Sequence, residues 1–384
     1  MQKLSYSKLF FAFLKLGAGA FGGPALVEYI RKLSVEQNSW LDDDDFNEGV
    51  ALCQSIPGAT AMQMATYVGL RTNGISGAVL SCSGFVLPAF LLMLVFSALY
   101  THFHDFPHII SIFSGLNIII VAIMLKATYS FGKTSLKDHK DIGLAIISAG
   151  LLWIGANPFL VVSGAALLGI LAFKGEDVVV KSGGRGTALF HIKYILFFSV
   201  ALVSAFVFLY FFSMKLFQLS LVMFKVNLFA FGGGYGALPL MLHEVVHVRE
   251  WMNNKTFMDA IALGQITPGP IIITSAFVGY LVNGLSGAIV STISVFTSSF
   301  FVMIIAVPFF EKLRISRYFY SITRGVLVTF TGLLLYVSFN FTLAIQWDII
   351  KIIFAFLVLV ALFKKINIFY VVLAGIPISI LLFR

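Results

Sequence analysis

Long apolar runs fill most of this chain, and short segments rich in charge, glycine or proline separate them. A helix that crosses the hydrocarbon core needs about 20 apolar residues, so these runs predict membrane spans. In the first half we expect spans at 5–21, 46–70 (broken), 77–100, 108–130, 142–156 and 158–173. A connector at 189–212 precedes spans at 214–231, 257–280, 287–310, 318–340, 348–363 and 366–383. The pattern predicts thirteen crossings, of which the shortest could pair as re-entrant hairpins.

The two halves of the chain repeat one another. Residues 6–24 parallel 213–234, and residues 40–78 parallel 251–288. The matches include two lysines, two Phe-Gly-Gly sequences, two tryptophans and two Pro-Gly sequences: Lys15 with Lys225, Phe21 with Phe231, Trp40 with Trp251, and Pro57 with Pro268. Self-similarity of this kind indicates a duplicated unit. We expect a first transporter repeat at 1–173, a linker and connector helix at 174–212, and a second repeat at 213–384.

The basic loops predict that the second repeat is inverted. Lys and Arg favour the cytoplasmic side of a membrane. The loop at 311–317 is strongly basic, whereas its counterpart at 100–108 contains no Lys or Arg. Equivalent loops therefore lie on opposite sides, and the connector reverses the second half. The expected fold is an all-α polytopic membrane protein with two inverted six-span halves and a cytoplasmic N-terminus.

Composition supports the bilayer and excludes other settings. Hydrophobic residues make up 59% of the chain and charged residues 11%, compared with about a quarter charged residues in soluble domains. The net charge of +9 lies in short loops between spans, so it does not indicate nucleic-acid binding. Cys53 and Cys82 lie in apolar runs, where no disulfide is expected, and the N-terminus lacks a signal-peptide pattern. No cofactor is expected.

Two Pro-Gly sequences are expected to break helices inside the membrane. Proline removes a backbone donor and clashes with the preceding turn. The helices around Pro57-Gly58 and Pro268-Gly269 should therefore stop and restart. Each new half-helix presents unpaired N–H groups and the positive end of its dipole, and an anion is a suitable partner for both. Inverted-repeat carriers often place their substrate site at such breaks.

Neutral hydrogen-bond donors surround both breaks and could bind a tetrahedral oxyanion. The candidates are Gln54, Thr60, Gln63, Gln265, Thr267 and Thr274. Neutral donors can hold a charged substrate without a permanent countercharge that would oppose its release. The alternative is that these side chains only satisfy helix ends. Four glycines in the two Phe-Gly-Gly sequences allow turns that other residues disfavour, and could bind substrate or serve only as hinges or in packing: Gly22, Gly23, Gly232 and Gly233.

The charged residues within apolar runs are further candidates. Lys15 and Lys225 could compensate the charge of an anion, or could extend to the membrane interface instead. Glu48 and Asp259 occupy equivalent positions in the two halves. They could couple transport to protons, pair with the lysines, or simply be solvated. Glu244 is a third candidate for coupling.

One motif raises a different class of function. His243, Glu244 and His247 have the H-E-x-x-H spacing of zinc metalloproteases, in which two histidines bind zinc and the glutamate acts as the base. The equivalent segment of the first half, residues 32–36, repeats none of these ligands. No supportive motif supplies a third ligand, so an intramembrane protease is the less favoured alternative.

The paired motifs resemble a known family. "FGGP" and "FGGG" each precede a Pro-Gly break, and the tails "GLRTNGISGA" (69–78) and "GYLVNGLSGA" (279–288) follow. This set is similar to the chromate ion transporter family, in its long two-domain form. The resemblance implies a multi-pass plasma-membrane carrier that exports chromate, with sulfate as a competing anion. Uptake or exchange of sulfate or another oxyanion remains the alternative, and a homodimer remains open.

The chain departs from the pattern of that family at three places in its first half. Family members often carry a histidine after "FGGP" and a glutamate before the Trp-Leu pair, where this chain has Val27 and Leu33. The first break reads "PGAT" rather than "PGP". These differences leave the identity of the anion open.

Overall fold

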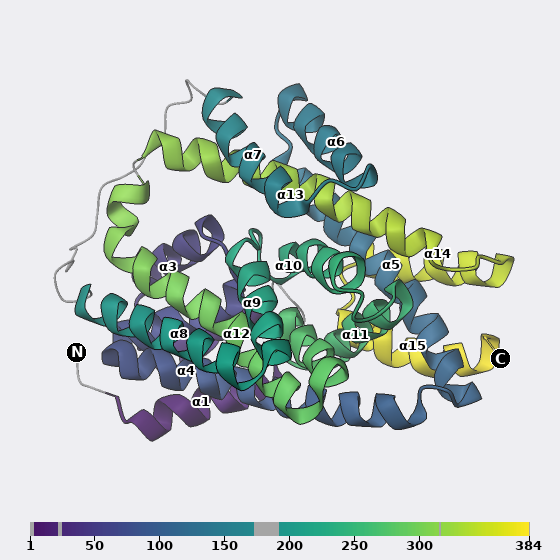
Figure 1. Cartoon of the computed structure of the whole chain (residues 1–384), viewed down its shortest axis with the longest axis horizontal. Coiled ribbons are helices and arrows are strands. Elements are labelled where there is room, and N and C mark those ends of the chain that lie inside the picture. The colour runs from purple at the N-terminus through teal and green to yellow at the C-terminus, as the bar shows by residue number, and fades with distance from the viewer. Residues whose placement is uncertain (1–3, 22–24, 173–191, 315, 384) are drawn as a thin grey trace.

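The computed structural model describes residues 4–21, 25–172, 192–314 and 316–383, and every regular element in these ranges is helical (Figure 1). The first half contains α1 (Tyr6–Gly19), α2 (Ala25–Arg31), η1 (Lys32–Gln37), α3 (Asp43–Ser55), α4 (Thr60–Phe103), α5 (Pro107–Ser135), α6 (His139–Trp153) and α7 (Pro158–Ala172). The connector is α8 (Ile192–Phe212). The second half contains α9 (Met214–Leu228), α10 (Gly234–Leu242), η3 (His243–Val248), α11 (Asn254–Ile266), η4 (Ile271–Ile273), α12 (Thr274–Arg314), α13 (Arg317–Leu343), α14 (Ile349–Phe363) and α15 (Ile368–Leu382). The prediction of an all-α membrane protein is confirmed.

The two halves exchange helices. Within each half the first helix packs on the long kinked helix, α1 on α4 and α9 on α12. The later helices pack across the halves instead: α6 and α7 of the first half lie on α13, and α14 and α15 of the second half lie on α5. These two sets of cross-half contacts are counterparts of one another, as a two-fold relationship requires. The hydrophobic core is therefore shared between the two repeats.

The helices differ in whether their length suffices to cross a membrane. Among the described residues, five helices are long and apolar enough to span a membrane: those at 60–103, 107–135, 193–212, 271–310 and 317–343. The helices α6, α7, α14 and α15 have 15 residues each. At 1.5 Å per residue each is about 22 Å long, which is shorter than the hydrocarbon core. The expectation of thirteen crossings stays a prediction, and the short helices pair with one another as α6 with α7 and α14 with α15.

The kinks in α4 and α12 explain the repeated glycine motif. Each helix has non-helical backbone at an Asn-Gly pair, where Gly74 and Gly284 have φ of 65° and 57°. The limbs on either side of the kink approach closely. A Cβ on Gly69 would lie 2.4 Å from the carbonyl oxygen of Gly77, and the equivalent distance from Gly279 to Gly287 is 2.2 Å. The motif therefore specifies a sharp bend whose two limbs touch through backbone.

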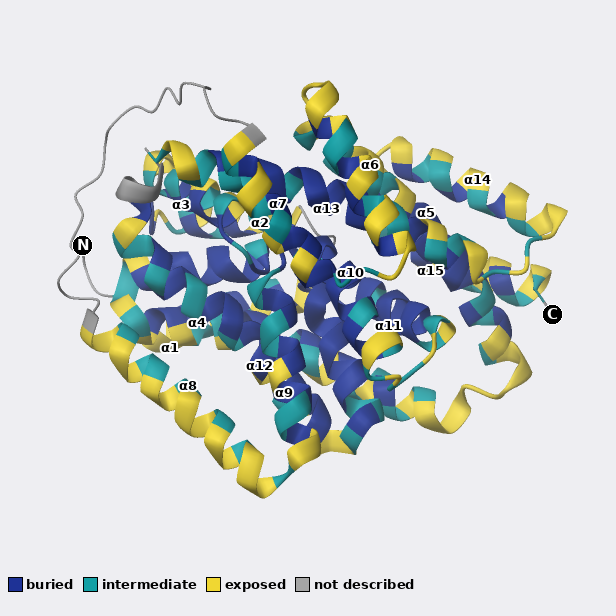
Figure 2. Ribbon diagram, turned by 45° about the horizontal axis from the view of Figure 1, so that its top comes forward, coloured by how far each residue is buried: buried dark blue, intermediate teal, exposed yellow. Residues whose placement is uncertain are grey.

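The connector α8 lies on the outside of the helical body. None of its 18-residue apolar window is buried, and exposed residues line its outer face (Figure 2). Because a bilayer replaces water around these helices, an apolar outer surface is expected there. The connector was expected at 189–212, and α8 covers this range from Ile192 onward; residues 189–191 lie outside the described residues.

A buried ion group fixes α6 on α13. Arg324 of α13 is 7% exposed and donates to Asp141 at 3.0 Å and to Asp138 at 2.8 Å. Asp138 and Asp141 form a capping box at the start of α6. The backbone N–H of Asp141 and the Arg324 guanidinium hold the pKa of Asp138 below its usual value. The position equivalent to Arg324 in the first half is Ser114, so this group has no counterpart there.

Replacing Arg324 with methionine should destabilise the protein by about 3–5 kcal/mol, because the fully buried Asp141 loses its cation. Thermal unfolding in detergent would measure the loss. The double variant Arg324→Met with Asp141→Asn should recover part of the stability, since no buried charge is then left alone. An unfolding temperature for Arg324→Met equal to that of the parent would contradict this assignment.

Candidate functional site

Each predicted break is hydrogen-bonded to the opposite half of the chain. The N–H of Gly58, in the first break, donates to the carbonyl of Ala230 at 2.7 Å. The N–H of Gly269, in the second break, donates to the carbonyl of Ala20 at 2.9 Å. Each break is thus bonded to the chain just before Phe-Gly-Gly of the opposite half. We call the described residues 20–21, 57–60, 230–234 and 268–271 the central junction.

Glycine is needed at several positions of the junction. Gly58 and Gly269 have φ of 128° and 100°, a region that L side chains rarely adopt. A Cβ on Gly58 would also lie 2.5 Å from Nε2 of Gln63. Gly232 and Gly233 have φ of 79° and 81°. Gly22 and Gly23, the predicted equivalents in the first half, lie outside the described residues.

Helices begin at the junction without side-chain caps. The residue before α4 is Ala59, the residue before α10 is Gly233, and the residue before η4 is Pro270, and none provides a capping side chain. Most other helices are capped by Asp, Ser or Asn side chains: Asp42, Asp138, Ser213, Asn253, Ser316, Asp348 and Asn367. The first N–H groups of a helix have no acceptor within it. The junction therefore concentrates uncapped positive helix ends.

The polar groups of the junction are arranged differently in the two halves. The N–H of Ala59 donates to Oγ of Ser299 at 2.9 Å, and Asn227 donates to the same oxygen at 2.7 Å. In the repeat, Pro270 replaces Ala59 and has no N–H to satisfy. The position equivalent to Ser299 is Ala89, whose methyl group lies against Gly269. In each half the residue at this position matches its neighbour: the serine accepts from a buried N–H, and the alanine lies where proline has no N–H to satisfy.

The predicted neutral donors fall into two groups. Thr267 and Thr274 use their hydroxyls locally, donating to Leu263 and Ile271 carbonyls at 2.8 Å. Gln63 is fully buried and donates to the carbonyl of Pro57 at 2.6 Å, so it closes the first break.

Thr60 stands at the first turn of α4, with Oγ1 3.0 Å from the position that a Cβ on Gly233 would occupy. Its hydroxyl is thus directed at the glycine turn that opens α10 in the other half. Of the predicted hydroxyl candidates, Thr60 is best placed to meet a ligand.

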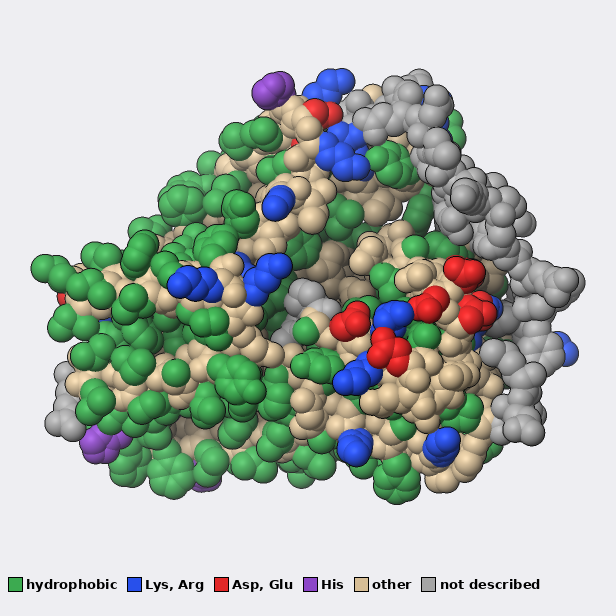
Figure 3. Space-filling model, turned by 180° about the vertical axis from the view of Figure 1, so that it is seen from behind, with side chains coloured by type: hydrophobic (Ala, Val, Ile, Leu, Met, Phe, Trp, Pro, Cys, Tyr) green, Lys and Arg blue, Asp and Glu red, His purple; other side chains and the backbone are tan. Residues whose placement is uncertain are grey.

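The two glutamines differ in exposure. Gln54 on α3 is exposed, whereas Gln265 on α11 is 5% exposed and lies 3.5 Å from the hydroxyl of Tyr235. The helix α11 packs against α5 and α15, whereas α3 packs on α4 with a smaller contact to α12. The face that carries α3 is hollowed, with acidic and basic side chains gathered beside the hollow (Figure 3). The second break is therefore enclosed and the first is more open.

The two lysines also differ. Lys15 is exposed on α1. Lys225 is half-buried, forms a 2.5 Å ion pair with Glu244, and lies 3.9 Å from the centre of the Phe159 ring. Leu33 stands at the position equivalent to Glu244, so the first half lacks this partner. Lys225 is therefore balanced by a fixed carboxylate in this structure.

Asp259 is buried among neutral donors. It is 3% exposed on α11 and accepts hydrogen bonds from Tyr100 at 2.8 Å and from Asn117 at 2.9 Å. Both donors belong to the first half, so this carboxylate connects α11 to α4 and α5. Glu48, its equivalent, is half-exposed on α3 and interacts electrostatically with Arg71. A buried carboxylate with only neutral hydrogen-bond partners is the feature expected of a proton-binding residue.

The H-E-x-x-H sequence does not form a metal centre in the described residues. Its residues lie in the π-helical segment η3, where Glu244 is committed to Lys225 and His247 is exposed. No cluster of three or more histidine, cysteine, aspartate or glutamate side chains that could hold a metal occurs within the described ranges. The geometry thus offers no support for the protease alternative.

A family model described as chromate transporter matches residues 7–170 and again residues 217–380. The chain belongs to the chromate transporter family. Both halves match the same model separately, which agrees with the repeat detected in the sequence. No solved structure matches the chain.

Several relatives with the name of transporter or chromate transport protein cover most of the chain. An uncharacterised transporter of Methanocaldococcus jannaschii is 42% identical over 377 residues, which cover 97% of this chain and 94% of that protein. The chromate transport protein of Cupriavidus metallidurans is 30% identical over 317 residues, 78% of this chain and 73% of that protein. A probable chromate transport protein of Synechococcus elongatus is 29% identical over 328 residues, 83% of this chain and 80% of that protein.

Sequence reasoning missed the polar residues that the repeat does not share. Asn227 and Ser299 occupy positions where the first half has Gly17 and Ala89, and Asn117 occupies a position where the second half has Leu327. The available signal was a polar residue that interrupts an apolar span in one half only.

Replacing Ser299 with alanine should destabilise the protein by about 1–3 kcal/mol, because the buried N–H of Ala59 loses its acceptor. Thermal unfolding in detergent would measure the change. Ser298 is the matched control: it is equally buried, and its hydroxyl has no partner among the described residues. Equal destabilisation by Ser298→Ala and Ser299→Ala would contradict the assignment.

Proposed function

We propose that this protein is a secondary carrier that exports chromate, or an oxyanion of the same tetrahedral form, by alternating access. The observation that carries the proposal is the central junction, where uncapped helix ends from both halves meet and Thr60 directs its hydroxyl at the Gly233 turn. Such helix ends favour anions. Neutral donors bind an anion without a fixed countercharge that would hold it permanently. Relatives named as chromate transport proteins support the choice of anion.

The difference between the two breaks supports alternating access. In a carrier with two related halves, one side of the substrate site is enclosed while the other is open. Here α11 is packed against α5 and α15, and α3 lacks a comparable contact with the equivalent helices α13 and α7. In our proposal α11 leaves α5 and α15 while α3 packs onto α13 and α7. The site then opens to the other side of the membrane and the anion is released there. The cytoplasmic N-terminus and the plasma membrane location expected from the sequence are part of the same proposal.

Uptake of chromate into everted membrane vesicles tests the function, because export from the cell corresponds to uptake in this orientation. The parent protein should show uptake that depends on a proton gradient, and excess sulfate should test selectivity. Thr60→Val should raise KM about 10- to 100-fold, which corresponds to loss of one hydrogen bond to a charged group. No uptake under any gradient would contradict the proposal.

Thr72→Val is the matched control for Thr60→Val. Thr72 lies on the same helix, and its hydroxyl donates to the carbonyl of Val68 at 2.9 Å. Removing that hydroxyl should leave KM for chromate near the parent value. A rise equal to that in Thr60→Val would indicate a general effect on α4 and not loss of a ligand.

We further propose that Asp259 takes up the coupling proton. Its buried site provides two neutral donors, Tyr100 and Asn117, and Lys255 and His104 interact with it electrostatically. When α11 opens, the carboxylate would lose Tyr100 and Asn117 and gain access to a proton. Protonation and packing of α11 would then be linked.

Asp259→Asn should abolish the dependence of uptake on the proton gradient while preserving exchange of labelled for unlabelled chromate. The reason is that asparagine can keep a hydrogen bond but cannot bind and release a proton. Glu48→Gln provides the control at the equivalent, more exposed position and should retain gradient dependence. Gradient-driven accumulation by Asp259→Asn at the parent level would rule out this role.

A further inference from the structure

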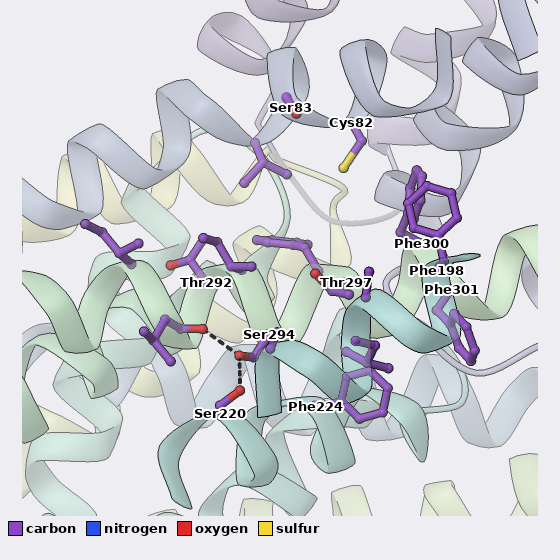
Figure 4. Close-up of a pocket in the computed structure, with 18 of the residues that line it drawn as sticks. Cys82, Ser83, Phe198, Ser220, Phe224, Thr292, Ser294, Thr297, Phe300 and Phe301 are labelled. Atoms are coloured by element: carbon purple, nitrogen blue, oxygen red, sulfur yellow. Dashed lines mark hydrogen bonds between the residues drawn. The ribbon is translucent and has the colours of Figure 1, made fainter. Parts of the chain in front are cut away.

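A large crevice separates the connector from the transporter halves. It has a volume of about 710 Å³ and lies between α8, α4, α9 and α12 (Figure 4). The connector packs on α9 and, less extensively, on α12. The crevice thus lies between α8 and α4 of the first half, where these two helices do not pack against each other. None of its lining residues belongs to the central junction, and the transport mechanism proposed above does not use it.

The walls of the crevice suit a hydrocarbon ligand. No charged residue lines it, and phenylalanines from α4, α8, α9 and α12 form much of its surface. Several of its hydroxyls are already engaged: Ser294 bonds to Ser220 at 2.7 Å (Figure 4). Thr292 donates to the carbonyl of Ala288 at 2.7 Å. A polar ligand would find few free partners there. Water is an equally poor occupant, because a buried water needs two to four polar partners.

The crevice lies at the depth of lipid chains. The helix α8 has 21 residues, which corresponds to about 30 Å, the thickness of the hydrocarbon core. The crevice residues of α8 extend from Phe198 to Leu209, which is the middle of that helix. In a protein whose helices span the bilayer, an opening at this depth faces acyl chains.

We propose that the crevice binds an acyl chain of a membrane lipid, which packs between the connector and the first half. A second copy of this chain is a poorer occupant. A helix with its side chains is about 10–12 Å across, so a volume of this size would hold only about 6–9 Å of such a helix. A flexible hydrocarbon chain can instead follow the slot and fill it. The bound chain supplies the apolar contact that α8 lacks on the side of α4.

Photo-cross-linking of the full-length protein tests the site. The protein would be reconstituted in phosphatidylcholine vesicles that contain a lipid with a photoreactive group midway along one acyl chain. After irradiation, peptide mass spectrometry should locate the adducts mainly on the crevice segments of α4, α8 and α12. Adducts spread evenly over all outward-facing helices would overturn the proposal, since they would indicate general contact with the bilayer.

Tryptophan substitutions provide a matched comparison. Ala201→Trp and Ala205→Trp place a large side chain into the crevice, whereas Val203→Trp adds the same group on an exposed face of α8 that does not line it. Both crevice variants should lose most of the cross-linking to α4 and α12, and the control should retain it. Size-exclusion profiles should be the same for all three. Retained cross-linking in the crevice variants, or a change of oligomer size in place of lipid loss, would refute an acyl-chain site.

Discussion

The rest of the structure depends on how backbone groups are satisfied in the middle of the membrane. A helix broken at Pro-Gly leaves polar groups that lipid cannot bind, so the protein must supply their partners. It does so reciprocally: Gly58 bonds to Ala230 of the second half, and Gly269 bonds to Ala20 of the first. Neither half could close its own break in this way. The exchange of α6–α7 and α14–α15 between the halves follows the same logic, since each repeat completes the other.

The two halves differ at pairs of contacting residues, and in each half the two members of a pair suit one another. Ser299 is present where Ala59 has a buried N–H, and Ala89 is present where Pro270 has none. The carboxylates differ in the same manner. Asp259 is buried and finds donors in Tyr100 and Asn117, whose equivalents in the other half are Phe310 and Leu327. If α3 packed as α11 does, Glu48 would meet apolar side chains. We infer that only one half offers a carboxylate for protons.

Much of the fold could be predicted from the sequence, because its signals are periodic and local. Proline and glycine mark the breaks at Pro57 and Pro268, and apolar runs give most helix positions within a few residues. The sequence could not show whether the short helices cross the membrane or form hairpins, since a 15-residue apolar helix is compatible with both. The exchange of hairpins between halves was also inaccessible, because it depends on contacts between distant segments.

The site was predicted less completely than the fold. The repeat identified the breaks, the glycine turns and both lysines, but it could not show that Lys225 is paired with Glu244 while Lys15 is exposed. Nor could it distinguish the exposed Gln54 from the buried Gln265, since equivalent residues have the same local sequence environment. Such differences arise from how α3 and α11 pack, and packing of this kind changes with the state of a carrier.

The central claim is that two equivalent breaks open in alternation around one junction. After replacement of Cys53 and Cys82, single cysteines at positions 54 and 265 can be tested in vesicles with a thiol reagent that does not cross membranes. In the state described here, Gln54→Cys should react from one side and Gln265→Cys should be protected. When chromate and a proton gradient are added, the cysteine at position 54 should react more slowly, and the cysteine at position 265 should react with reagent added on the opposite side of the membrane. Equal reaction of both cysteines from the same side, unchanged by substrate, would contradict the account.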